Sequence, residues 1–407
     1  KLVTDLQRYN HAEANAIALQ ADGKIVVTGS LGNGDFYQNE WRFTSISVTR
    51  YNQDGSLDMS FGMQGTGSVR VTPKNQQAYA IAMQPDGKIV VAGVVETALS
   101  YRDMVIIRFN VNGTVDNSFG TNGVVTLDIN NREEAARAVK IQKDGKILVG
   151  GFSKVHASEN GFAVLARYTA AGVLDNSFGT NGISYQEFSA GGIHALAIES
   201  DNQVITAGYS GSTGFSSSFF VQRYSLNGTL QTGVGTNLLL DDEALSVALQ
   251  QDGKIVISGY ADISVSDEYR PSMFVVLRYN KNLTIDNSFG NAGIVANSFG
   301  QINNERQVAS TAVIVQPDSR IIASGYTRNA NGSTDFVVMR YNSDGSPDIS
   351  FGENGLILIH PDEYNSRLYG TVLQPDGKIV TAGFYTNMNN EALGFCPARG
   401  INMMRFN

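Results

Sequence analysis

The chain has 407 residues, of which 42% are hydrophobic and 17% are charged, and its formal net charge at pH 7 is −8. An acidic chain argues against nucleic acid and anionic membrane surfaces as partners, because both require a basic face. The sequence also lacks an apolar run of the about 18 residues that a membrane span needs, and its single cysteine, Cys396, excludes an internal disulfide framework and a multi-cysteine metal site.

The first residue is Lys1, with neither an initiator methionine nor a charged-then-apolar leader. We therefore expect the chain to have been trimmed, for example at a signal peptide. The composition includes 43 glycines but only 8 prolines, together with 17 tyrosines and 20 phenylalanines. This profile is typical of many short strands joined by tight turns.

One block of sequence recurs seven times, most clearly as LQPDGKIVTAG at Leu373–Gly383. Each copy opens with a short apolar strand, such as 80–83, which ends at a turn. The turn aspartates are Asp22, Asp86, Asp144, Asp201, Asp252, Asp318 and Asp376. Five copies read Asp-Gly-Lys, whereas copy four has Asn202 and copy six has Ser319 after the aspartate. Asp-Gly predicts a tight hairpin turn, because the second residue must adopt a positive φ.

A β-branched strand such as 88–91 follows the turn, and a glycine ends it seven residues after the aspartate. The seven glycines are Gly29, Gly93, Gly151, Gly208, Gly259, Gly325 and Gly383. A glycine that recurs at this place predicts either a positive φ or a close approach of two backbones.

A third strand ends in an arginine-aromatic pair, and the phenylalanine of an S-F-G motif follows eleven residues after the arginine in five copies. The arginines are Arg50, Arg108, Arg167, Arg223, Arg278, Arg340 and Arg405. We expect five of them to form ion pairs with the aspartate of D-x-S-F-G, namely Asp58, Asp116, Asp175, Asp286 and Asp348. Copy four has Gln231 there and copy seven has no such turn, so those two arginines need other acceptors.

A short fourth strand closes each unit, so every copy reads as four antiparallel strands in about 58 residues, a β-propeller blade. The first strand of each copy carries a small residue at the same position, as expected where seven strands converge on an axis and leave little room. These residues are Ala16, Ala80, Ala138, Ala195, Ser246, Ala312 and Gly370. Copy seven stops after its third strand, whereas residues 1–5 resemble a fourth strand. The sequence therefore predicts an all-β, seven-bladed propeller in one domain, 1–407, with blade seven built from about 367–407 plus 1–5.

Spacing separates a uniform face of this ring from a variable one. The distance from turn aspartate to glycine is constant, as is that from arginine to the S-F-G position. The distance from glycine to arginine, in contrast, varies between 15 and 22 residues. Variable loops on a repeated scaffold favour a binding surface at that end.

The residue just before each innermost small residue also varies among the copies, whereas the residue before that stays apolar or small. These rim positions are Asn15, Tyr79, Arg137, His194, Leu245, Thr311 and Tyr369. We expect ligand contacts from Asn15, Tyr79, Arg137, His194 and Tyr369, flanked by the loop aromatics Trp41, Tyr269 and Tyr385. The alternative is a solvated channel mouth whose residues drift freely.

Other candidates are weaker. Asp241, Asp242 and Glu243 could bind a hard cation, but three consecutive carboxylates cannot point one way along a strand, so a solvated cluster is the preferred interpretation. The four histidines show no metal-ligand spacing, and Cys396 has no base beside it. The sequence contains no known catalytic or phosphate-binding motif, so we predict no catalytic residues, no metal site and no cofactor.

The segments DGKIVVAG at Asp86–Gly93 and DNSFGTNG at Asp116–Gly123 resemble the bacterial delta-60 repeat family over essentially the whole chain. Copy four departs most, with DNQVITAG at Asp201–Gly208 and QTGVG at Gln231–Gly235. The resemblance implies a β-propeller in a secreted, periplasmic or cell-surface bacterial protein, with adhesion as the suspected role and no catalytic residues to carry over.

Two functions follow as hypotheses. The first is a monomeric, non-enzymatic binding module that recognises a glycan or a protein through its variable face. The second is a propeller enzyme, a lyase or hydrolase, that works at the axial mouth with His194 as base and Arg137 or Tyr79 stabilising negative charge.

Overall fold

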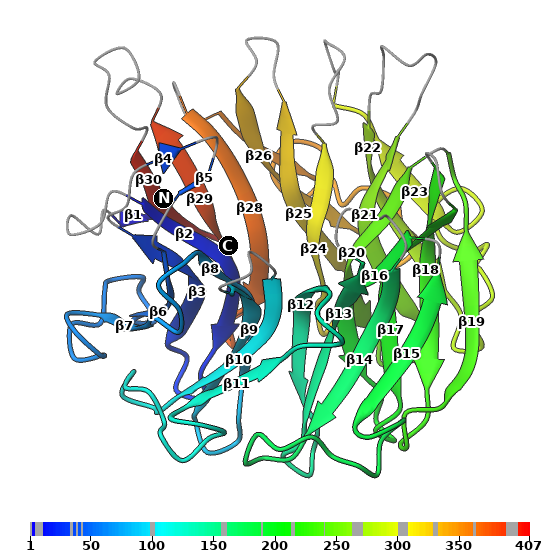
Figure 1. Cartoon of the computed structure of the whole chain (residues 1–407). Coiled ribbons are helices and arrows are strands. Elements are labelled where there is room, and N and C mark those ends of the chain that lie inside the picture. The colour runs from blue at the N-terminus through cyan, green and yellow to red at the C-terminus, as the bar shows by residue number, and fades with distance from the viewer. Residues whose placement is uncertain are drawn as a thin grey trace.

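The computed structural model describes residues 2–4, 11–32, 36–37, 40–41, 44–97, 102–155, 161–188, 190–212, 216–239, 241–262, 272–299, 308–328, 333–360, 364–387 and 398–407. These residues form seven four-stranded antiparallel sheets, which stand side by side in chain order around an axis (Figure 1). No helix occurs in the ranges just given. The predicted all-β propeller with seven blades is confirmed.

The blades repeat one strand order from the axis outward. The innermost strands are β2 (His11–Leu19), β8 (Gln76–Met83), β12 (Glu133–Ile141), β16 (Ala190–Ile198), β20 (Asp242–Leu249), β24 (Ala309–Val315) and β28 (Tyr364–Leu373). The second strands are β3 (Ile25–Gly32), β9 (Ile89–Glu96), β13 (Ile147–Lys154), β17 (Val204–Ser212), β21 (Ile255–Asp262), β25 (Ile321–Arg328) and β29 (Ile379–Asn387).

The third strands are β6 (Ser45–Tyr51), β10 (Arg102–Phe109), β14 (Gly161–Tyr168), β18 (Ser216–Tyr224), β22 (Ser272–Tyr279), β26 (Thr334–Tyr341) and β30 (Ala398–Phe406). The outer strands are β7 (Thr66–Val69), β11 (Val124–Leu127), β15 (Ile183–Phe188), β19 (Leu230–Thr236), β23 (Ile294–Asn297), β27 (Leu356–Ile359) and β1 (Leu2–Thr4). An extra hairpin, β4 (Phe36–Tyr37) with β5 (Glu40–Trp41), belongs to the long connection of blade one.

The N-terminal strand closes the ring. Strand β1 pairs antiparallel with β30, with Leu2 opposite Met403 and Thr4 opposite Ile401. A parallel bridge between His11 and Arg399 also joins blades seven and one. Both chain ends therefore lie in one sheet, and the last blade keeps its fourth strand.

Hydrophobic burial between neighbouring sheets holds the ring together. The second strands are apolar on both faces because each is covered by a blade on either side; β9, for example, is buried from Ile89 to Val95. The hydrophobic clusters accordingly contain residues of two adjacent blades. No blade can bury these faces alone, which explains why the unit must repeat.

Every innermost strand carries a β-bulge at its rim residue, as at Tyr79, where pairing shifts between Ala78 and Ala80. The recurrent glycine lies opposite this bulge, inside the second strand rather than at its end. A Cβ on Gly93 would stand only 2.0 Å from the carbonyl oxygen of Gln77, and the other six glycines are equally tight. Their φ angles are not positive, so close backbone approach is the reason for glycine. The positive φ occurs instead in the hairpin turns, for example at Gly87 and, in copy four, at Asn202.

The uniform face is held by a repeated arginine contact. In blade two, Arg108 donates through Nε to Asp116 (2.7 Å), stacks over the Phe119 ring (4.7 Å) and donates to the Ala170 carbonyl of blade three. The turn lysine Lys88 reaches the same carboxylate at 2.9 Å. The predicted ion pairs are confirmed in all five copies, at 2.7–2.8 Å.

The two arginines that lack this aspartate have other acceptors, as expected. Arg223 donates to both carboxylate oxygens of Glu199, at 2.7 and 2.9 Å. Arg405 donates to the backbone carbonyl of Gln53 at 2.8 Å, which ties blade seven to blade one.

Candidate ligand-binding site at the axial mouth

The bulges place all seven rim side chains at the axial mouth, where each is half-buried. A bulge inserts one extra residue into the strand and so re-aims its side chain. Asn15, Tyr79, Arg137, His194 and Tyr369 thus occupy equivalent bulge positions on the innermost strands of five blades.

Hydrogen bonds join the innermost strands of the neighbouring blades one and two. Asn15 donates through Nδ2 to the Ala78 carbonyl (2.8 Å), and Gln77 donates through Nε2 to Glu13 (3.0 Å). The Tyr79 hydroxyl donates to the Gln77 side chain at 2.9 Å. This sector is polar, and its donors and acceptors satisfy one another.

Arg137 of blade three lies beside this sector and contacts aromatic rings rather than hydrogen-bonding partners. Its guanidinium carbon lies 4.0 Å from the centre of the Tyr79 ring and 5.9 Å from that of Phe152. Within the described ranges it forms neither an ion pair nor a hydrogen bond, and its buried Nε has no acceptor. A half-buried guanidinium of this kind presents an uncompensated positive charge to the mouth.

His194 lies between Arg137 and the acid of blade five. Its Nδ1 is 3.9 Å from a carboxylate oxygen of Glu243, and its ring meets Tyr209 edge-on at 5.2 Å. Burial, followed by the charge of Arg137, lowers the pKa of His194 to about 3. Burial, followed by the Glu243 charge, raises the pKa of Tyr209 to about 12. At neutral pH the mouth therefore contains a neutral imidazole and a protonated phenol beside a fixed cation.

Blades six and seven contribute a second aromatic and cationic pair. Arg367 lies over the Tyr326 ring at 4.8 Å, and the Tyr369 ring packs on Phe384 at 5.8 Å. The hydroxyl of Thr311 donates to the Leu368 carbonyl at 2.5 Å, across the same blade junction.

The three flanking aromatics predicted from the sequence have different outcomes. Trp41 belongs to strand β5, but its side chain lies outside the described part of the structure, as does all of Tyr269. Tyr385 is not a loop residue: it lies in β29, half-buried, and its ring covers Gly400, where a Cβ would come within 2.4 Å of it. Assigning Tyr385 to an exposed loop was wrong, because β29 extends beyond its glycine.

Sequence reasoning missed Phe152, Tyr209, Tyr326 and Arg367. The first three occupy one register, the residue directly after the recurrent glycine, which pairs across from the bulged strand. That register is aromatic in five of the seven copies: Ser30, Val94, Phe152, Tyr209, Tyr260, Tyr326 and Phe384. The signal that could have found these positions is a recurrent aromatic directly after the glycine.

The acidic run beside blade five is not a solvated cluster. Asp242 is fully buried, and its Oδ2 accepts the backbone N–H groups of Leu238 and Leu239 at 2.6 and 3.1 Å. Asp241 accepts from the backbone N–H of Ser217, and Glu243 faces His194. Because side chains alternate along a strand, the three carboxylates separate into three different environments.

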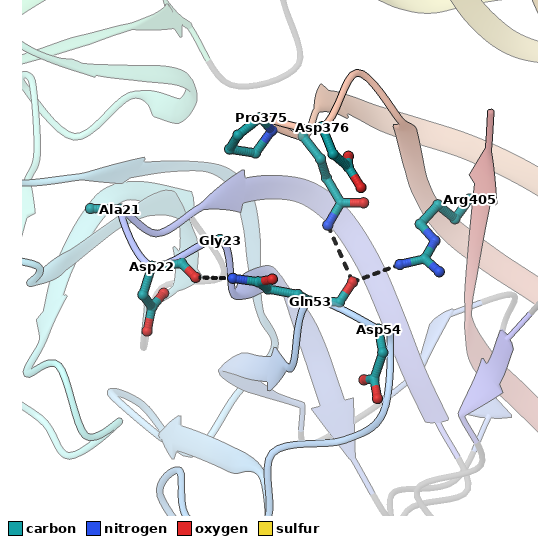
Figure 2. A pocket seen from close by; sticks show the side chains of 9 residues that line it. Ala21, Asp22, Gly23, Gln53, Asp54, Pro375, Asp376 and Arg405 are labelled. Carbon is teal, nitrogen blue, oxygen red and sulfur yellow. Dashed lines mark hydrogen bonds between the residues drawn. The ribbon is translucent and has the colours of Figure 1, made fainter.

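A hollow on the opposite, uniform face lies at the seam of blades seven and one (Figure 2). It is lined by turn residues, including Asp22, Asp54 and Asp376, and by Arg405. Figure 2 shows Gln53 at its centre, where its carbonyl accepts from Gln374 and Arg405 and its side chain donates to the Asp22 carbonyl.

Fold and repeats together define a seven-bladed β-propeller with a polar, aromatic axial mouth. Five of its seven copies match the family model described as "Domain of unknown function (DUF5122) beta-propeller", at residues 20–61, 84–119, 142–178, 250–289 and 316–351. Copies four and seven, which lack the D-x-S-F-G aspartate, are not matched. A search of curated proteins found no match.

Solved structures share the architecture at low identity. An ulvan lyase bound to -[GlcA(1-4)Rha3S]- is 12% identical with a TM-score of 0.53, and the match covers 97% of this chain and 94% of that one. The polysaccharide lyase Uly1 is 10% identical with a TM-score of 0.50, over 100% and 93% of the two chains. At these identities the likeness concerns the fold alone. The described residues include no helix long and apolar enough to cross a membrane.

Proposed function

We propose that this protein binds an acidic saccharide at the axial mouth of its variable face. The observation that carries the proposal is Arg137, a half-buried guanidinium clamped on the Tyr79 ring with no carboxylate partner among the described residues. Guanidinium groups recognise carboxylate and sulfate groups through paired N–H donors. A carboxylate or sulfate from a ligand would supply the counter-charge that the described residues do not provide.

The aromatic side chains around Arg137 suit a sugar. Tyr79, Tyr209, Tyr326 and Tyr369 are all half-buried at the mouth, so each exposes part of an amphipathic ring. Such rings stack on the apolar face of a pyranose while their hydroxyls reach its polar edges. Arg367, over Tyr326 on the far side, offers a second cation for the next acidic residue of a polymer.

The overall charge makes this recognition selective. With a net charge of −8, the molecule as a whole repels a polyanion, so binding depends on a local cation such as Arg137. A neutral glycan would gain the stacking without the charge contact. We therefore expect acidic polysaccharides to bind more tightly than neutral ones of the same length.

The test is a glycan array followed by calorimetry with acidic and neutral oligosaccharides. Arg137→Ala should reduce affinity for the acidic ligand at least tenfold and reduce its salt dependence. The control is Lys143→Ala, which removes a positive charge from a turn on the uniform face and should bind as the parent does. Equal binding by Arg137→Ala, or binding only of a protein from the cell envelope, would refute the proposal.

A second candidate is a lyase acting on a uronic acid polymer, favoured by the contact of His194, Tyr209 and Arg137. In that reaction Arg137 would neutralise the uronate carboxylate and His194 would remove the adjacent carbon-bound proton. The electron pair of the broken carbon–hydrogen bond would form the new double bond. The glycosidic oxygen would leave at the same time and take a proton from Tyr209. The low pKa of His194, about 3, makes it a weak base, which is why binding is preferred. Formation of an unsaturated uronate by the parent, lost in Tyr209→Phe, would establish the enzyme instead.

The cellular setting is part of the same proposal. The delta-60 repeat resemblance, together with the low charge content, supports a secreted, periplasmic or cell-surface location in a bacterium and a role in adhesion by a monomer. Fractionation of the cells that naturally produce the protein would check this, and recovery only in the cytoplasm would contradict it.

A further inference from the structure

Three acidic side chains meet at the junction of blades two and three, apart from the axial mouth. Asp103 lies on β10, Asp128 follows β11, and Glu134 lies on β12, the innermost strand of the next blade. One carboxylate oxygen from each lies within 4.8 Å of the other two. The outer half of blade two thus converges with the inner strand of blade three at this point (Figure 1).

Glu134 has no free access to water to stabilise its charge. The residue is 0% exposed, and only its Oε1 has a partner, the hydroxyl of Ser153 at 2.8 Å. Its Oε2 is buried without any hydrogen bond. A buried carboxylate oxygen with no donor is costly and calls for a proton or a cation.

The surroundings of Glu134 add negative charge. Besides burial, the charges of Asp128 and Asp103 raise its pKa, and the Asp128 charge raises that of Asp103. The nearest arginine on the connecting segment, Arg132, is placed over the Phe162 ring at 4.6 Å. Three carboxylates therefore share a small volume, and none of them forms an ion pair with a residue in the described part of the chain.

We propose that Asp103, Asp128 and Glu134 bind one calcium ion, which joins blades two and three. Calcium is coordinated by oxygen at about 2.3–2.6 Å, so opposite ligands stand about 5 Å apart, and the present spacing fits within that sphere. Magnesium needs ligands at about 2.0–2.1 Å in a strict octahedron and usually retains water, which suits this irregular set less well. Asp128 is exposed and Asp103 half-buried, so the ion can enter from solvent and complete its shell with water.

The site can be tested on the full chain without knowing its saccharide. After chelator treatment, calorimetric titration with Ca²⁺ should show one ion per chain. At about 100 times Kd, the melting temperature should rise by about 3 °C. Tyr185 lies close enough for the Glu134 charge to act on it, so it should sensitise terbium luminescence at the same site.

Variants distinguish this site from surface binding. Asp103→Asn and Glu134→Gln should each abolish the calcium-induced shift and the terbium signal. Glu133→Gln is the matched control, because Glu133 is adjacent on β12 but pairs with Lys154 at 3.4 Å, and it should retain both. Absence of calcium and terbium binding in the parent chain, or binding that persists in both site variants, would overturn the proposal.

Discussion

Arg137 shows how one residue acquires a role through its backbone position. The bulge turns it into the mouth, and Tyr79 of the preceding blade holds its guanidinium in place. In a regular strand, by contrast, successive side chains point alternately to the two faces of the sheet. The bulge itself depends on Gly151, where a Cβ would stand 1.9 Å from the Ala135 carbonyl oxygen.

The recurrent glycines lead to a stability prediction. Gly93→Ala should lower the free energy of unfolding by about 3 kcal/mol, because its Cβ would overlap the backbone of the bulge. Gly235→Ala is the control, since its Cβ would meet nothing closer than 3.9 Å. Urea denaturation would measure both, and equal stability of the two variants would contradict the explanation.

The protonation state of His194 leads to a second prediction at this scale. Because burial and Arg137 lower its pKa to about 3, the ring remains neutral between pH 5 and 8. Affinity for an acidic oligosaccharide should therefore be nearly constant over that range at fixed salt. Calorimetry at several pH values would check this, and a rise in affinity on acidification through pH 6.5 would show that the imidazole titrates.

Among the structural elements, the turn from third to fourth strand adds polar contacts between the blades. The aspartate of this turn forms an ion pair with the arginine of its own blade, and that arginine donates a hydrogen bond to a backbone carbonyl of the next blade. One carboxylate therefore contributes to the contact between two sheets. For Asp116, burial opposes ionisation, but hydrogen bonds from Ser118 and Lys88 outweigh it, and the pKa is lowered below 3.8. In Asp348 the hydrogen bond from Ser350 is the largest contribution, and the pKa falls to about 2.

A depressed carboxyl pKa gives a defined pH dependence. The stability contributed by these aspartates is complete above the unfolded-state pKa of about 3.8 and is lost as the pH falls through their folded-state values. Asp116→Asn should cost about 3–5 kcal/mol at pH 7, because it leaves Arg108 without its carboxylate. The difference from the parent should shrink near pH 2, as denaturation at the two pH values would show; a constant difference would exclude linkage to this carboxyl.

At the scale of the whole molecule, ring closure by β1 is the decisive contact. Three residues, Leu2 to Thr4, cover the outer edge of β30 and complete blade seven. Removing 1–6 should abolish cooperative unfolding or lower the melting temperature by many degrees, because the last blade would expose an unpaired edge. Circular dichroism during heating would measure this, with a chain extended at its N-terminus as control; an unchanged melt would show that closure does not need β1.

The repeat in the sequence determined the blade number, the strand order, the turn chemistry and the arginine–aspartate pairs, because these contacts are local or occur in every copy. Comparison of the copies also singled out the rim positions, since a position whose residue type varies within a uniform frame stands out. The bulge, the aromatic register after the glycine and the meeting of Asp103, Asp128 and Glu134 were decided only by tertiary structure. These features depend on contacts between strands and between neighbouring blades, and residues far apart in sequence become neighbours only when the ring closes.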